Sequence, residues 1–90
     1  MADHRSRWIA VQGHIGGNAE KWETCYHWDG RSFARKSAAV GHGLRTFGSD
    51  DFNLGRVKAG ALIWWGWMEN PLLEDLASVA AALNLEVGRD

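Results

Sequence analysis

The stretch 61-ALIWWGWMENP-71 places three tryptophans within four positions, and its pattern decides most of the predicted fold. Successive side chains of an extended strand point to opposite faces of the sheet. Trp65 and Trp67 are therefore predicted to share one face, and Trp64 to lie on the other. Because both faces of this strand are apolar, we expect one to enter the core and the other to expose an aromatic ring.

A preceding strand is predicted to pair with this stretch in a hairpin that turns at Ala59-Gly60. Continuous pairing around the turn sets Phe52 opposite Trp67 and Leu54 opposite Trp65. All four side chains then lie on the same face, so we expect them to form a shared part of the core.

The end of the stretch marks the start of a C-terminal helix. Asn70 is a favourable N-cap residue, and Pro71 suits the first helical position because its missing N–H is not needed there. Apolar side chains follow at helical spacing, at Leu73, Leu76, Ala77, Ala80 and Leu83. This pattern predicts an amphipathic helix with one apolar stripe.

The N-terminal half of the chain repeats the order of strand, strand and helix. The segments 8-WIAVQGHI-15 and 22-WETCYHWD-29 both alternate, and a register with Ile9 opposite Trp28 collects the large apolar groups on one face. Helical spacing then predicts a helix over residues 34–47. Gly41 and Gly43 weaken this helix, so it is expected to fray, kink or end early at Gly43.

These elements predict an α+β fold with the order ββαββα. Each predicted helix has a single apolar stripe to bury. We therefore expect a four-stranded antiparallel sheet with two helices packed on one face, leaving the other face open. A chain of 90 residues is expected to form one domain, residues 1–90.

Composition restricts the classes of protein further. The chain is 46% hydrophobic and 23% charged, which is typical of a folded globular domain. Cys25 is the only cysteine, so no internal disulfide can form. The longest apolar run, residues 59–68, falls short of the roughly 20 residues that a membrane helix needs. No secretory signal pattern opens the sequence, and a cytoplasmic protein is expected.

The open sheet face is the predicted binding surface, because exposed aromatic patches commonly mark contacts between proteins. Its expected partner-binding residues are Trp64, Trp8, Leu62, Met68, Arg56 and Lys58. A protein partner or a homodimer is the first expectation. In the alternative interpretation, Trp64 is covered by Trp8 or the N-terminal arm and simply completes a small core.

Two other functions remain open at this stage. Base stacking on single-stranded nucleic acid would use exposed tryptophans, with Arg31, Arg35, Arg56 and Lys58 near the phosphates. The net charge of −1 counts against this alternative. A small metal- or thiol-dependent enzyme would use Cys25, His27 and Asp51.

The first predicted hairpin carries a polar face with His14, Glu23, Cys25 and His27. These are metal-ligand residue types, but they lack the CxxC or HExxH spacing of known zinc sites. We expect a surface pair between His14 and Glu23, with no metal, cofactor or catalytic residue. The sequence thus predicts a non-catalytic interaction domain, in the size range of small adaptors, immunity proteins and phage or plasmid inhibitors.

Overall fold

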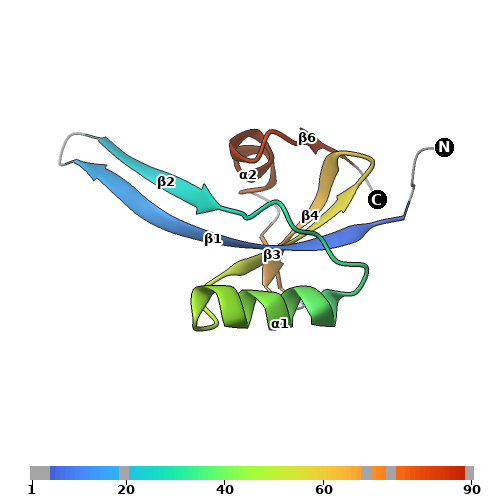
Figure 1. The fold of residues 1–90 in the computed structure, drawn as a ribbon. Helices are drawn as coiled ribbons and strands as arrows, with labels where there is room; N and C mark the ends of the chain where they lie inside the picture. Colours follow the sequence, from blue (N-terminus) through green and yellow to red (C-terminus); the bar gives the residue numbers. More distant parts are fainter. Residues whose placement is uncertain (1–4, 19–20, 68–69, 73–74, 89–90) are drawn as a thin grey trace.

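The computed structural model describes residues 5–18, 21–67, 70–72 and 75–88, and for residues 15–18 and 21–23 it describes the backbone alone. The described residues form an α+β fold, as predicted, with a mixed sheet and two helices (Figure 1). The strands are β1 (Arg7–Asn18), β2 (Lys21–His27), β3 (Asn53–Lys58), β4 (Ala61–Trp67), β5 (Asn70–Pro71) and β6 (Glu86–Val87); the helices are α1 (Lys36–Phe47) and α2 (Leu76–Ala82).

The strand order in the described sheet is β2-β1-β3-β4-β5, and β6 also pairs with β4. Neighbouring strands are antiparallel except for β4 and β6, which are parallel. The four predicted strands correspond to β1–β4. The purely antiparallel, four-stranded prediction is wrong because two short strands, β5 and β6, add to the far edge of β4.

The two helices lie on opposite sides of the sheet, which corrects the expectation that both pack on one face (Figure 1). Alternate residues of β1 explain the arrangement, because Ile9 and Val11 join the cluster under α2 whereas Ala10 joins the cluster under α1. All three side chains are at most 3% exposed. The N-terminal half of β1 therefore buries both of its faces, and no open sheet face remains there.

Helix α1 closely matches its prediction. It begins at Lys36, two residues later than expected, and continues past Gly43 to Phe47. Gly48 then adopts a left-handed conformation (φ 73°), and its N–H donates to the carbonyl of Leu44. This is the usual glycine-terminated helix end.

Helix α2 begins later than the sequence predicts. Asn70 and Pro71 form β5, paired with Trp67 and Gly66 of β4, and the helix starts only at Leu76. Proline is tolerated in an edge strand, where its missing N–H interrupts no ladder. The predicted stripe residue Leu73 lies outside the described residues, and Ala77 is exposed, while Ala80 is buried as expected.

The β3–β4 hairpin turns at Ala59-Gly60, as predicted, with both residues at positive φ (51° and 80°). The predicted register holds next to the turn, where Val57 pairs with Leu62. A bulge then shifts it by one residue, so that Gly55 pairs with Trp65. The shift places Leu62 and Trp65 on the same side of the sheet.

The three tryptophans of β4 divide between the two clusters differently from the prediction. Trp65 is 1% exposed in the cluster under α2, which confirms its predicted burial. Trp64 and Trp67 are half-buried and pack against the other cluster, which contains Phe52 and Leu54. The prediction that Trp65 and Trp67 share one core with Phe52 and Leu54 is therefore wrong.

Strands β1 and β2 form a two-stranded ribbon that extends away from the body of the molecule (Figure 1). The first half of β1 pairs with β3, up to Val11, and its second half pairs with β2 from Gln12 onward. Gly13 faces Tyr26, two positions away from the predicted Thr24. A shift of two residues preserves the alternation of faces, so the described side chains keep their predicted faces.

Candidate functional site

Three predicted partner-binding residues meet in one cluster on the α1 side of the sheet. Arg56 of β3 lies between its strand neighbours Trp8 and Trp64. The two indole rings meet edge to face with centroids 5.7 Å apart. The Arg56 guanidinium carbon lies 5.8 Å from the centroid of Trp8, and its Nε donates to Ser6 Oγ at 2.9 Å.

Lys36, in the first turn of α1, completes this cluster. Its ammonium nitrogen lies 5.4 Å from the Trp8 ring centroid and 5.6 Å from that of Trp64. Cations are attracted to the negative face of an indole ring, so this contact stabilises the start of the helix. The two rings are half-buried under α1 and do not lie on an open face.

The other predicted partner-binding residues are elsewhere. Leu62 is fully buried (0% exposed) beneath α2, which corrects its assignment to a contact surface. The bulge in β4 is the reason, because it moves Leu62 onto the side of Trp65. Lys58 is half-buried at the end of the hairpin. Met68 lies outside the described residues.

The outer edge of β2 is a second candidate surface. Within the described part of the chain, β2 has a strand neighbour on one side only, β1. A groove of about 370 Å³ runs beside the C-terminal end of this strand, lined by Tyr26, His27, Trp28, Asp29, Thr46 and Phe47. The groove therefore lies between two elements. One is β2 with the residues that follow it, and the other is the C-terminal end of α1.

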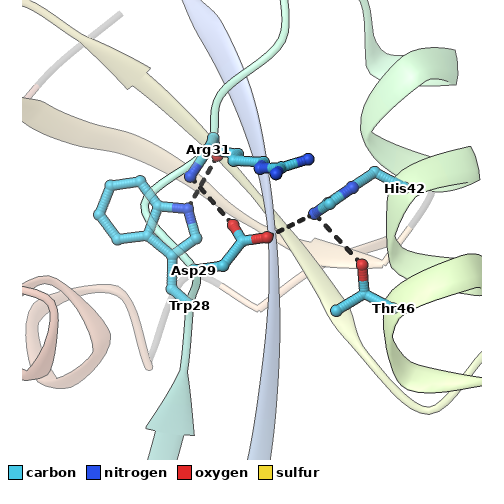
Figure 2. A network of polar contacts seen from close by, with 5 residues as sticks. All are labelled: Trp28, Asp29, Arg31, His42 and Thr46. Carbon is cyan, nitrogen blue, oxygen red and sulfur yellow. Dashed lines mark hydrogen bonds and ion pairs between the residues drawn. The ribbon is translucent and has the colours of Figure 1, made fainter.

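A polar network joins the loop after β2 to α1 (Figure 2). Asp29 Oδ2 lies 2.7 Å from His42 Nε2, and Thr46 Oγ1 lies 3.3 Å from the same nitrogen. The backbone N–H of Arg31 donates to Asp29 Oδ1 at 3.0 Å, and Trp28 Nε1 donates to the carbonyl of Arg31 at 2.9 Å. One oxygen of the Asp29 carboxylate thus contacts α1, and the other holds the loop itself in shape.

The chemistry of this network differs from that of a catalytic triad. A carboxylate accepts hydrogen bonds, so His42 Nε2 must carry the proton that it donates to Asp29. That nitrogen then has no lone pair with which to take a proton from the Thr46 hydroxyl. In a triad, the acid and the nucleophile contact different ring nitrogens. The arrangement fits a structural clamp between the loop and α1.

The carboxyl of Asp29 gives this clamp a pH dependence. The hydrogen bond from the Arg31 backbone N–H has the largest effect on the pKa of Asp29 and lowers it below its ordinary value. Burial opposes this effect, and the hydrogen bond from His42 and the nearby positive charges lower the pKa further. A depressed pKa means that the carboxylate stabilises the fold above its unfolded-state pKa. This stabilisation is lost as the pH falls through the folded-state pKa.

We therefore expect Asp29→Asn to lower the free energy of unfolding at neutral pH and to have a smaller effect in acid, where the native carboxyl is itself protonated. Urea melts at pH 7 and at a pH below the folded-state pKa of Asp29, located by titration of the native chain, would measure both differences. Asp50→Asn, at an exposed loop position, is the matched control. An equal loss of stability at both pH values would contradict this account of the clamp.

The exposed face of the ribbon brings together three of the four residues predicted to share it. Cys25 is the cross-strand neighbour of His14, a place that the predicted register gave to Glu23. The rings of His14 and His27 stack with centroids 4.6 Å apart, and His27 Nε2 and His14 Nδ1 share a hydrogen bond of 3.1 Å. The side chain of Glu23 is not described.

Asp51, the third residue of the enzyme alternative, lies in the loop between α1 and β3 and not on the ribbon. Its backbone N–H donates to Ser49 Oγ, and its carbonyl accepts from Gln12 Nε2. These contacts fit the role of a turn residue. Among the described side chains, no three metal-ligand residues are grouped closely enough to hold an ion.

Comparisons with known proteins give no information about this site. No protein-family model matches the chain, and neither curated proteins nor solved structures give a significant match. No helix among the described residues has the length and apolar character needed to cross a membrane.

Two features of the site were not predicted from the sequence. The contact of Lys36 with both indole rings depends on where α1 meets the sheet, which no local pattern specifies. No local pattern predicted a contact for His42. Its position one helical turn before Thr46 was visible in the sequence, but its pairing with Asp29 depends on the path of the intervening loop.

Proposed function

We propose that this chain is a small non-catalytic protein-interaction domain that binds through the outer edge of β2. The observation that carries the proposal is that β2, within the described residues, pairs on one side only and borders a groove. An unpaired strand edge presents N–H and C=O groups to any extended segment that can pair with it. The adjacent groove can take alternate side chains of that segment.

A second copy of the chain is the partner that fits this edge best. A two-stranded ribbon is only marginally stable by itself in water, and a third strand stabilises it. Two copies related by a two-fold axis would each present β2 to the other, giving a sheet in the order β1-β2-β2-β1. Such a contact is self-complementary, as a closed dimer requires.

Sedimentation equilibrium over a wide concentration range is expected to show a reversible monomer–dimer equilibrium. Thr24→Pro and Cys25→Pro form a matched pair, because the N–H groups of adjacent strand residues point to opposite neighbours. One variant should retain the native circular dichroism yet remain monomeric, since its missing N–H faces outward. The other should disrupt the ribbon itself.

A monomer at every concentration would refute self-association. Two folded proline variants that both dimerise like the native chain would refute the assignment to β2.

Binding of single-stranded nucleic acid is a second candidate, favoured by the cations above the Trp8 and Trp64 rings. Lys36 and Arg56 both lie within 6 Å of the Trp8 centroid. If this cluster takes a base and its phosphate, mixed oligonucleotides should quench tryptophan fluorescence at low salt, and added salt should weaken binding. Unchanged fluorescence at low salt would eliminate this candidate.

A further inference from the structure

A cavity of about 250 Å³ lies between the N-terminal end of β1, the loop after β2 and the β3–β4 turn. Pockets for drug-sized ligands usually span about 300–1,000 Å³, so this one suits a ligand with a single ring. We propose that it binds a small aromatic carboxylate. The residues that line it are Arg5, Arg7, Ile9, Trp28, Gly30, Ser32, Val57, Ala59 and Gly60.

The charge of the cavity favours an anion. Arg5 and Arg7 both line it, and none of the described lining residues is acidic. Guanidinium groups bind carboxylates through paired, charge-assisted hydrogen bonds. A ligand that enters this cavity therefore gains most if it carries a carboxylate at the arginine side.

Arg7 is held in position before any ligand binds. Its Nε donates to Ser32 Oγ at 2.6 Å, and its Nη2 donates to the Ser32 carbonyl oxygen at 2.8 Å. A guanidinium has five N–H groups, so Nη1 and the second N–H of Nη2 remain for a carboxylate. Because Ser32 already fixes this side chain, binding costs little of its conformational freedom.

The walls of the cavity favour an aromatic body over a bare inorganic ion. Ile9 belongs to the cluster under α2, and Trp28 and Val57 pack against that cluster. The indole of Trp28 is fixed by the hydrogen bond from its Nε1 to the carbonyl of Arg31 (Figure 2). A flat ring can pack favourably against a fixed indole, whereas apolar walls leave the oxygens of a phosphate or sulfate without partners.

The cavity is separate from the surface proposed for self-association. None of its lining residues belongs to β2, since Trp28 follows the last residue of that strand. Ligand binding and association through the β2 edge can therefore fail independently of each other.

Titration of the ¹⁵N-labelled native chain with phenylacetate, followed by NMR, tests the proposal. We expect saturable shifts of the Gly30, Ser32 and Gly60 amides and of the Trp28 indole N–H, with one ligand per chain. Phenylacetamide has nearly the same shape but no charge. It should bind at least about tenfold more weakly, because one hydrogen bond to a charged group corresponds to about that factor in affinity.

Arg7→Gln should weaken phenylacetate binding at least about tenfold, because it removes the fixed charge. Arg45→Gln is the matched control, with the same change of charge at an exposed position in α1, and it should leave binding unchanged. Circular dichroism establishes that each variant folds; if Arg7→Gln does not fold, the comparison of phenylacetate with phenylacetamide on the native chain decides.

Three results would overturn the proposal. The first is that the lining residues show no shifts up to the solubility limit of phenylacetate. The second is that phenylacetamide binds as tightly as phenylacetate. The third is that folded Arg7→Gln binds phenylacetate as tightly as Arg45→Gln does.

Discussion

Replacement of Trp65 by alanine is expected to lower the free energy of unfolding by about 3–5 kcal/mol, the usual cost of deleting a large buried side chain. Trp65 is 1% exposed and packs with Ile9, Val11 and Leu62, each of which is 0% exposed. Its ring also meets Tyr26 edge to face, with centroids 6.1 Å apart. The cavity would lie between the sheet and α2, where little else can fill it.

Trp64→Ala provides the matched control for this prediction. Trp64 is the adjacent residue and the same type, but it is half-buried and packs against the other cluster. Urea melts of the two variants should therefore show the larger loss for Trp65→Ala. A larger loss for Trp64→Ala would contradict the assignment of Trp65 to the buried core under α2.

Alanine substitutions at two glycines of α1 are expected to have opposite effects. A Cβ at Gly43 would collide with the ring of Phe52, which is 4% exposed and cannot easily move. Overpacking of this kind typically costs about 1–3 kcal/mol. A Cβ at Gly41 would meet only Arg45 Nη1, at 3.3 Å, which is the end of a flexible side chain.

Gly41→Ala should therefore stabilise the helix by up to about 1 kcal/mol, because alanine is the better helix former. Thermal melts of Gly41→Ala and Gly43→Ala would measure both effects. Destabilisation by both variants to the same extent would indicate that α1 does not pack closely on Phe52.

The elements with strong local signals were predictable from the sequence. Alternation in β1 and β2 assigned their faces correctly even though the register differs by two positions, because a shift of two preserves the alternation. The glycine of the Ala59-Gly60 turn indicated the hairpin correctly. Helix α1 was predicted from its apolar spacing, and it continues past Gly41 and Gly43. Gly43 has a packing role that the sequence did not reveal, because a larger residue there would collide with Phe52.

The arrangement of these elements in space could not be predicted as well. The bulge in β4 inserts one residue between Leu62 and Trp65, so both side chains lie in the cluster under α2, and no turn residue marks the bulge. Burial of Ala10 was not predicted, because one small side chain does not reveal whether a helix covers it. Ala10 and its strand neighbour Leu54 both lie in the cluster under α1.

The candidate site was partly predictable, because part of it depends on strand pairing and part on how α1 packs. Trp8, Arg56 and Trp64 do meet, because they occupy neighbouring positions on three adjacent strands. Their cover by Lys36 depends on the docking of α1, which is a long-range contact. The pairing of β2 on one side only, among the residues that the structure describes, is likewise a property of strand order, which the sequence of any single strand does not contain.

Association through the β2 edge is tested most directly by amide hydrogen exchange at low and high protein concentration. The account predicts that alternate amides of β2, those whose N–H groups point away from β1, become protected as concentration rises, because they pair with a second copy. Amides of β3, which pair on both sides within one chain, should remain unchanged. Equal exchange of the β2 amides at all concentrations, up to the solubility limit, would contradict the account.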